Sequence, residues 1–278
     1  MQHTESIPVS ILGPEGLSPA PYRAASLAEA VVYEPNGVYT VARTFFRTRA
    51  LLFDAHLDRL EESARLAGIL LDLDRARLRA ALREMIEVAG YADTKFRITV
   101  PEADPAHLYL SIEALQPVDP VLLANGVNVA LVPIRRATPQ IKTTVWMEQR
   151  RGTASALPGG AYEGVMQDDR GCVLEGLSSN FYGVLAGVLR TAGDGVLAGI
   201  TRKAIFEIAP DVLPVDLTPI CREDIGRLDE AMLTSSGRGV VPVTAIDGKP
   251  VGSGRVGPVV QALMAGYGQW TEAHAEPI

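Results

Sequence analysis

Lysine is scarce in this chain of 278 residues, which holds four lysines against 22 arginines. Cysteine and histidine are scarce as well, with two and four residues. Two cysteines without a C-x-x-C spacing predict no disulfide framework. The histidines are scattered and show no metal-ligand spacing, so we expect no structural metal. These residues are Cys172 and Cys221, and His3, His56, His107 and His274.

Long apolar runs and an excess of basic charge are also missing. The net charge of −7 and the pI near 5.2 argue against nucleic acid as a partner. No apolar run approaches the ~18 residues that would span a bilayer, so we expect no membrane partner. The first residues, MQHTESIPVSILGPEG, lack the basic and apolar regions of a signal peptide. We therefore expect a cytoplasmic protein.

The composition that remains is typical of a globular protein with more than one core. The chain is 47% hydrophobic and 21% charged, and its length predicts about two domains. The stretch QPVDP at 116–120 has the composition of an interdomain linker. We expect a smaller N-terminal α/β domain over 1–117, a linker over 118–123 and a larger C-terminal domain over 124–278.

Hydrophobic periodicity predicts the elements of the N-terminal half. The glycines and prolines of residues 1–25 indicate irregular structure, and residues 36–53 predict two strands with a turn near Arg47–Arg49. Two amphipathic helices follow, the first capped by Asp54, and then a hairpin around 101–107. The helix residues expected to face inward are Leu57, Leu60, Ala64 and Ala67, and then Leu78, Leu82, Met85 and Val88 or Ala89.

The C-terminal half predicts mainly short strands. We expect a strand over 126–134, short strands with glycine turns over 162–191, a helix after Gly199, and two strands flanking a polar turn over 230–248. With the N-terminal half, this pattern predicts a two-domain α/β (α+β) fold.

Lys142 stands in the stretch TPQIKTTVWMEQRR, which is apolar and rich in threonine at its centre. A lysine in an apolar pocket loses the solvation of its ammonium, so its pKa falls and its amine becomes a nucleophile suited to a Schiff base. The alternative is a solvated lysine at the end of a strand.

Glu175 lies in the stretch LEGLSSNFYG, where its neighbours are apolar or small and polar. A buried carboxylate needs a cationic or hydrogen-bonded partner, and a protonated pyridine nitrogen would be one. The alternative is a capping glutamate before a Ser/Asn turn.

Three further stretches could bind an anion. A helix that opens at Ile200 and Thr201 would offer its first N–H groups to a phosphate. The turn TSSGRG offers hydroxyls and the guanidinium of Arg238, and Arg59 lies one helical turn from His56. The alternatives are an N-cap by Thr201, an ordinary hairpin loop and a solvated helix face. Taken together, a reactive amine, an acid for a ring nitrogen and several phosphate donors are what pyridoxal phosphate needs.

Six motifs stand in one order between Asn36 and Gly257: NGVYTVAR, HLDRL, IKT, EGLSSNF, GITR and TSSGRGVVPV. In this the chain resembles the class IV (fold type IV) pyridoxal-phosphate aminotransferases. That family includes D-amino-acid and branched-chain aminotransferases, (R)-amine transaminases and aminodeoxychorismate lyase. The resemblance implies a two-domain fold type IV architecture with pyridoxal 5'-phosphate in the interdomain cleft, and a homodimer.

The resemblance also implies a role for each matching residue. Lys142 would be the catalytic residue that holds the cofactor as a Schiff base, and Glu175 would pair with the pyridine nitrogen. The other cofactor-binding residues would be Arg59, Ser178, Ile200, Thr201 and Ser236. The substrate-binding residues would be Tyr39, Arg43, Gly237 and Arg238.

The expected activity is a transaminase that moves an amino group from an amino acid or (R)-primary amine to a 2-oxo acid by a ping-pong mechanism. Its partners would be a small-molecule donor and acceptor, and the donor's identity and chirality stay open. One alternative is a lyase that releases pyruvate from 4-amino-4-deoxychorismate, because Thr40 follows Tyr39 as it does in that enzyme. The other alternative is a non-enzymatic binding domain.

Overall fold

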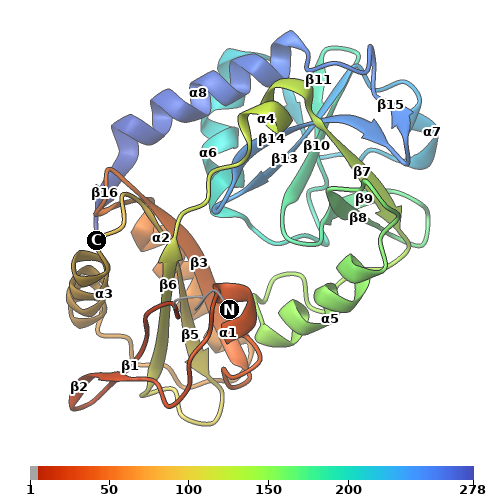
Figure 1. Ribbon diagram of the computed structural model, residues 1–278. Coiled ribbons are helices and arrows are strands. Elements are labelled where there is room, and N and C mark those ends of the chain that lie inside the picture. The colour runs from red at the N-terminus through yellow and green to blue at the C-terminus, as the bar shows by residue number, and fades with distance from the viewer. Residues whose placement is uncertain (1–5) are drawn as a thin grey trace, which may run out of the picture. The chain divides into compact units, whose positions relative to one another are not determined.

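The computed structural model describes residues 6–278, so His3 and the rest of the first five residues lie outside it. The chain divides into two compact units that are not continuous in sequence (Figure 1). Unit 1 consists of Met1–Gln116, of which residues 6–116 are described, together with Ile141–Gln149 and His274–Ile278. Unit 2 consists of Pro117–Gln140 and Arg150–Ala273.

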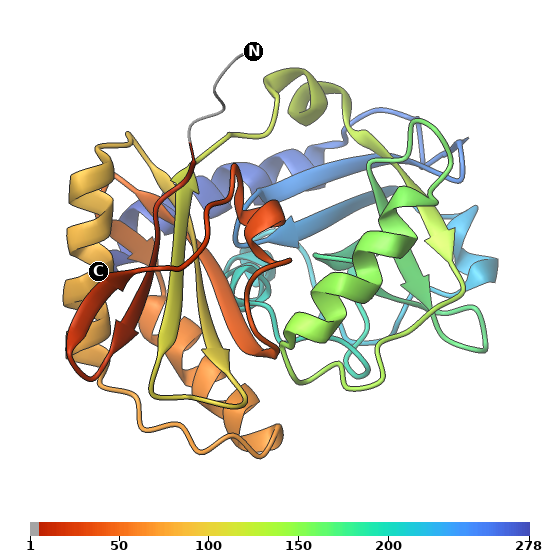
Figure 2. The same ribbon diagram turned by 60° about the horizontal axis from the view of Figure 1, so that its bottom comes forward.

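Unit 1 is built on a seven-stranded antiparallel sheet with the strand order β16-β4-β3-β5-β6-β1-β2. Helices α2 (Phe53–Leu66) and α3 (Arg75–Ala89) cover one face of it (Figure 2). Their leucines join Phe96 and Ile98 in one apolar core. The other elements are β1 (Val9–Gly13), β2 (Gly16–Pro19), α1 (Leu27–Ala30), β3 (Gly37–Phe45), β4 (Arg49–Leu51), β5 (Thr94–Pro101), β6 (Leu108–Ala114) and β16 (Ala275–Pro277).

The structure confirms the predicted strands of 36–53, both helices and the hairpin, and it corrects two details. Asp54 does not cap α2, because Leu52 takes the N-cap position in a left-handed conformation. Ala67 is exposed because α2 ends at Leu66. Of the two alternatives for the last inward residue of α3, the structure confirms Ala89, because Val88 is exposed.

The prediction of irregular structure over residues 1–25 is wrong for the hairpin β1–β2. Strand β1 pairs with β2 through a tight turn and with β6, so that Leu12 lies opposite Leu108. The partner β6 lies far away in the sequence, and the short strands are flanked by glycine and proline. The local sequence therefore shows only turn-forming residues and does not predict the two strands.

Unit 2 contains a nine-stranded mixed sheet with the order β12-β11-β10-β13-β14-β7-β8-β9, and β15 pairs with β14. An additional pairing of Asn180 in β10 with Glu175 in β9 closes the sheet into a barrel-like ring. The strands are β7 (Val127–Val132), β8 (Glu163–Gln167), β9 (Val173–Gly176), β10 (Asn180–Leu185), β11 (Val188–Arg190), β12 (Val215–Asp216), β13 (Glu230–Ser235), β14 (Gly239–Ile246) and β15 (Lys249–Pro250).

The remaining helical segments are α4 (Pro120–Asn125), α5 (Thr144–Ser155), α6 (Ile200–Ile208), the 3-10 helix η1 (Ala209–Asp211), α7 (Arg222–Ile225) and α8 (Pro258–His274). The predicted helix after Gly199 is confirmed as α6, and the predicted strand–turn–strand over 230–248 as β13 and β14. Among residues 6–278, no helix has both the length and the apolar character needed to cross a membrane.

Cys172 and Cys221 form a disulfide in unit 2, which corrects the expectation that the cysteines form no framework. The two residues are 49 positions apart in sequence and meet as an isolated antiparallel bridge. Next to them, the Val173 N–H donates to the Ile220 carbonyl at 2.7 Å. The pairing depends on this contact between distant segments, so the spacing of the cysteines did not predict it.

Candidate active site

Lys142 lies in an extended segment of unit 1 directly before α5, at the edge of β3. The Tyr39 N–H donates to the Lys142 carbonyl at 3.0 Å, and Val38 and Thr143 form an antiparallel bridge. The Lys142 N–H donates to Ser63 Oγ of α2 at 3.3 Å. Its backbone is therefore fixed by a strand and a helix. The side chain is half-buried, with Nζ 4.6 Å from the centroid of the Tyr39 ring.

Arg59 and His56 point from α2 toward the same residue of β3. Thr40 Oγ1 lies 2.8 Å from His56 Nδ1, and Arg59 Nη2 donates to Thr40 Oγ1 at 3.3 Å. Burial, with the positive charges of Arg59 and Lys142, holds the pKa of His56 well below its usual value. His56 is therefore a neutral ring at neutral pH. Unit 1 thus brings Tyr39, Arg59 and Lys142 to one part of β3 and α2.

Arg43 lies four residues beyond Tyr39 on the same strand. It is half-buried, and its guanidinium carbon lies 4.5 Å from the centroid of the Phe45 ring. This stacking directs the guanidinium along β3 toward Phe45.

Glu175 is buried at the end of β9, and both of its oxygens have polar partners. Oε1 lies 3.3 Å from Nη1 of Arg136, whose side chain is itself buried. Oε2 accepts from the Leu197 N–H at 3.0 Å and from Asn180 Nδ2 at 3.3 Å. A carboxylate with this set of donors is stable as an anion inside the protein. It fits the requirement for an acid that faces a protonated ring nitrogen.

The N-terminus of α6 lies close to the same carboxylate. Gly199, and not Thr201, holds the N-cap position, and within the described chain no side chain caps this helix end. Asn180 links the two features, because it also donates to the Leu197 carbonyl at 2.9 Å. A Cβ added at Gly199 would lie only 2.1 Å from Asn180 Oδ1, so the close approach requires glycine there. The first N–H groups of α6 are therefore suited to an anion.

The turn 236–238 joins β13 to β14, and its predicted residues Ser236, Gly237 and Arg238 are half-buried. Arg238 Nη2 lies 2.7 Å from Glu163 Oε2 and donates to Ser178 Oγ at 2.9 Å. Burial lowers the pKa of Arg238, but the Glu163 carboxylate and the Tyr162 side chain together outweigh burial, so the pKa is raised. The hydrogen bond from Arg238 thus holds Ser178 next to the turn 236–238.

Two partners at the site, Arg136 and Glu163, were missed by the sequence analysis. Arg136 belongs to an arginine pair six residues before Lys142, which is a weak signal for a buried cation. Glu163 begins β8 and carries no local signal. Within residues 6–278, no group of three or more His, Cys, Asp or Glu side chains is placed to hold a metal ion.

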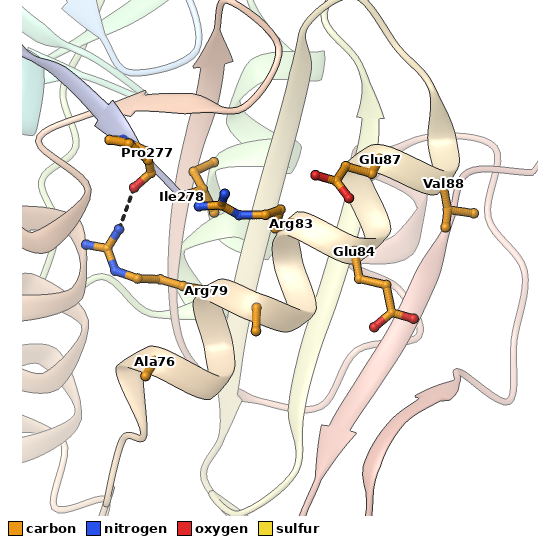
Figure 3. A pocket seen from close by; sticks show the side chains of 9 residues that line it. Ala76, Arg79, Arg83, Glu84, Glu87, Val88, Pro277 and Ile278 are labelled. Atoms are coloured by element: carbon orange, nitrogen blue, oxygen red, sulfur yellow. Dashed lines mark hydrogen bonds between the residues drawn. The ribbon is translucent and has the colours of Figure 1, made fainter.

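A surface pocket of about 570 Å³ lies in unit 1 beside α3 (Figure 3). Figure 3 shows Arg79 of α3 bonded to the carbonyl of Pro277 at one side of it. Of the site residues predicted from the sequence, all of which lie in the described chain, none lines this pocket. Its lining consists of Ala76, Arg79, Ala80, Arg83, Glu84, Glu87, Val88, Pro277 and Ile278.

Comparison with known proteins agrees with this geometry. The family model of amino-transferase class IV matches residues 37–246. The chain is 27% identical to D-alanine aminotransferase of Staphylococcus aureus over 257 residues, which is 86% of this chain and 90% of that protein. It is 29% identical to the branched-chain-amino-acid aminotransferase of Pseudomonas aeruginosa over 260 residues, or 82% of each chain.

Solved structures show the same fold. A branched-chain amino acid aminotransferase of T.th. solved with pyridoxamine 5'-phosphate has a TM-score of 0.80 at 20% identity, covering 95% of this chain and 94% of that one. The branched-chain aminotransferase of Thermoproteus uzoniensis with norvaline has a TM-score of 0.80 at 22% identity, covering 98% and 99%.

The antiparallel sheet of unit 1 and the barrel-like sheet of unit 2 therefore define a fold type IV enzyme. The match over residues 37–246 shows that the chain belongs to the class IV aminotransferase family. Enzymes of this family depend on pyridoxal 5'-phosphate. The residues present fit that cofactor, because they supply a half-buried primary amine, a buried carboxylate and an uncapped helix N-terminus among the described residues.

Proposed function

We propose that this enzyme transfers an amino group from an amino acid or an (R)-primary amine to a 2-oxo acid in two half-reactions of a ping-pong mechanism. The observation that carries the proposal is the environment of Lys142. Its backbone is bonded to Tyr39 and Ser63, and its half-buried amine lies over an aromatic ring. An amine held in this way is suited to act as nucleophile and base.

Lys142 has two roles in the proposed reaction. Its Nζ would hold the cofactor covalently, and once the donor had displaced it, the Lys142 amine would accept the proton from Cα of the donor. The same Nζ would then act as the acid that returns this proton to the cofactor. When bound, pyridoxal phosphate supplies the electron-withdrawing ring that stabilises the negative charge left at Cα.

Glu175 would accept a hydrogen bond from the pyridine nitrogen and would keep that nitrogen protonated. The proposal is supported by the donors on its other lone pairs, Arg136, Asn180 and the Leu197 N–H, which fix the carboxylate as an anion.

The phosphate is assigned to groups that can offer positive charge or N–H donors. These are Arg59, the N–H groups of Ile200 and Thr201 at the start of α6, and the hydroxyl of Ser236. Ser178 contributes to the cofactor site from the turn after Glu175. Tyr39, Arg43 and Gly237 are assigned to the substrate pocket.

The D-alanine and branched-chain aminotransferase relatives suggest donors of two kinds, a small D-amino acid and a hydrophobic L-amino acid. An (R)-primary amine is the third candidate. A homodimer in the cytoplasm completes the proposal, and light scattering of the purified protein would give twice the mass of one chain if the dimer forms.

The first experiment tests Lys142. The protein is loaded with pyridoxal phosphate and reduced with borohydride, and its peptides are examined by mass spectrometry. We expect the adduct on the peptide that contains Lys142, a visible absorption band before reduction, and loss of both in Lys142→Ala. Lys249→Ala, an exposed lysine of β15, is the matched control and should behave as the wild type. An adduct that persists in Lys142→Ala would refute the assignment.

The second experiment tests transamination. The loaded enzyme is titrated separately with D-alanine, L-leucine and (R)-1-phenylethylamine. A donor that removes the visible band and produces the pyridoxamine band identifies the transaminase and its class of donor. If none of them changes the band, transamination of these donors is refuted.

The lyase alternative rests on Thr40. The hydroxyl of Thr40 is bonded to His56 Nδ1 and accepts from Arg59, and it is fully buried. Because this hydroxyl already has two partners in unit 1, it supports the arginine assigned to the phosphate, and we place the transaminase first. Formation of p-aminobenzoate and pyruvate from 4-amino-4-deoxychorismate, without transamination, would reverse that order.

A further inference from the structure

Arg238 is held by unit 2's own residues on several sides. Its Nη2 lies 2.7 Å from Glu163 Oε2 and donates to Ser178 Oγ at 2.9 Å. Its Nε donates to Ser235 Oγ at 3.1 Å, and its guanidinium carbon lies 5.4 Å from the centroid of the Tyr162 ring. Only 25% of the side chain is exposed. Nε and Nη2 of this guanidinium therefore have protein partners before any substrate arrives.

Glu163 is the more buried member of this charge pair, with 5% of its side chain exposed. Its second oxygen, Oε1, accepts from the Ser178 N–H at 2.6 Å and from Ser178 Oγ at 3.0 Å. Glu163 therefore binds the backbone of one turn and the side chain of Arg238 from another. Ser178 Oγ stands between the two charges, because it donates to Glu163 and accepts from Arg238.

The turn that Glu163 holds is the one directly after Glu175. A Cβ added at Gly176 would lie 2.8 Å from Glu163 Oε1 and 2.2 Å from Ser179 Oγ. The close approach leaves no room for a side chain at that position. The turn 176–179 therefore rests directly on the carboxylate of Glu163.

A substrate carboxylate that bound Arg238 in the bidentate way would have to compete with Glu163 and Ser178 for Nη2. Glu163 is already in place, is fixed by two further hydrogen bonds, and would be left as a buried anion if it lost its cation. The ion pair between Glu163 and Arg238 should therefore persist when substrate binds. Arg238 is for this reason poorly suited to bind the substrate carboxylate.

We propose that Arg238 is a positioning residue, and that Glu163 and Arg238 together hold the turn 176–179 against the turn 236–238. The first turn follows Glu175 and the second carries Ser236, so the charge pair sets the spacing of two groups assigned to the cofactor. The proposal rests on the proposed function in so far as it takes Glu175 and Ser236 to bind pyridoxal phosphate. Under this proposal Arg238 supports cofactor binding. Its position in the stretch TSSGRG had instead suggested that it binds the substrate.

The test compares Arg238→Met, Arg238→Lys, Glu163→Gln and the double variant Glu163→Gln/Arg238→Met with the wild type. Arg135→Met is the matched control, because Arg135 forms an exposed ion pair with Asp169 in the same unit. The first readout is amide hydrogen exchange of the apoprotein over 176–180 and 235–239. The second is the affinity for pyridoxal phosphate, titrated through the visible band.

We expect Arg238→Met and Glu163→Gln each to accelerate exchange in both turns and to weaken cofactor binding by about tenfold or more. The double variant should bind pyridoxal phosphate no more weakly than the single variant with the lower affinity. Each single change already breaks the pair, so the second change has nothing further to remove. Arg238→Lys keeps the charge and should lose less, and Arg135→Met should lose nothing.

The proposal is overturned if Arg238→Met leaves both exchange and cofactor affinity unchanged while the KM for the amino-acid donor rises, because that is the signature of a substrate ligand. It is also overturned if Glu163→Gln and Arg238→Met act additively. Hydrogen exchange needs no cofactor, so it decides the role of the pair even if the wild type fails to attach pyridoxal phosphate at Lys142, a result that would refute the proposed function alone.

Discussion

Arg136 and Glu175 form a buried ion pair, with 3.3 Å between Nη1 and Oε1 and only 6% and 4% of the two side chains exposed. The arginine comes from the segment after β7 and the glutamate from the end of β9, so the contact joins two parts of unit 2. Glu175 accepts further hydrogen bonds from Asn180 and from the Leu197 N–H. The charge on Glu175 is therefore established by the fold itself, independently of a ligand.

Removal of Arg136 should destabilise unit 2 strongly. Arg136→Met leaves the Glu175 carboxylate buried without this cation, and we expect a loss of about 3–5 kcal/mol in the free energy of unfolding. The double variant Arg136→Met/Glu175→Gln should recover part of that loss, because no buried charge then remains at the pair. Urea unfolding of the apoprotein measures both. Equal losses for the single and double variants would contradict this account.

Replacement of Glu175 tests its chemical role separately from its structural one. Glu175→Gln keeps the size of the side chain but cannot hold the ring nitrogen in its protonated form. We expect kcat to fall about 10²-fold or more while the cofactor still attaches at Lys142. Glu175→Asp is the control that keeps the charge and should retain more activity. Full activity in Glu175→Gln would show that the carboxylate is not the partner of the ring nitrogen.

The sequence predicted the elements whose residues repeat with a clear period. Helices α2 and α3 follow the 3.6-residue repeat of their leucines, and β13 and β14 flank an obvious polar turn. The hairpin β1–β2 was missed because its strands are short and their main partner β6 is distant in sequence. Helix α8 was missed as well, and Gly266 and Gly268 inside it weaken its local signal.

The motifs indicate which side chains are candidates for the chemistry but not what surrounds them. The amine of Lys142 and the acid of Glu175 follow from the residue types. Their partners, Tyr39 and Arg136, follow only from how distant segments pack. The segment Ile141–Gln149 joins unit 1, although the residues on both sides of it belong to unit 2. This segment joins unit 1 because Lys142 and Thr143 pair with the edge of β3, which is distant in sequence. No local sequence pattern predicts that pairing.

His56 should make the stability of the protein depend on pH. Burial, with the charges of Arg59 and Lys142, holds its folded-state pKa well below 6.5, whereas the unfolded chain titrates near that value. As the pH falls below about 6.5, the unfolded state binds a proton that the folded state does not, so stability falls by up to about 1.4 kcal/mol per pH unit.

Urea unfolding between about pH 7.5 and pH 5.5 measures this dependence. His56→Asn removes the titrating ring, so the difference in stability between wild type and variant should shrink as the pH falls. A difference that stays constant over this range would mean that His56 binds its proton equally well in both states.

The disulfide between Cys172 and Cys221 should add measurable stability. It closes a loop between residues 49 positions apart, for which the chain-entropy estimate is roughly 4 kcal/mol. We expect dithiothreitol to lower the melting temperature of the wild type, and to have no effect on Cys172→Ser/Cys221→Ser. Thiol titration of the denatured, unreduced protein should find no free thiol. Two free thiols and a melting curve indifferent to reductant would contradict the bond.

Glu34 and Arg97 form a second buried ion pair, in unit 1, with 1% and 3% of their side chains exposed. Arg97 donates Nε to Glu34 Oε2 at 2.9 Å, and Thr99 and Ser111 donate to the same carboxylate at 2.7 Å each. This network ties the segment before β3 to strands β5 and β6. Because Arg97 is the cation of a buried carboxylate, Arg97→Met should cost about 3–5 kcal/mol of unfolding free energy.

The neighbouring pair of Lys95 and Glu113 provides the comparison for this prediction. Its lysine side chain is 37% exposed, so Lys95→Met should cost less than about 1 kcal/mol. The double variant Glu34→Gln/Arg97→Met should lie closer to the wild type than Arg97→Met alone, because no unpaired buried charge remains. The amide oxygen can still accept from one of the Thr99 and Ser111 hydroxyls, and the amide NH2 can donate to the other. If Arg97→Met and Lys95→Met cost the same, burial does not set the strength of these pairs, and the argument for Arg136 and Glu175 would weaken with it.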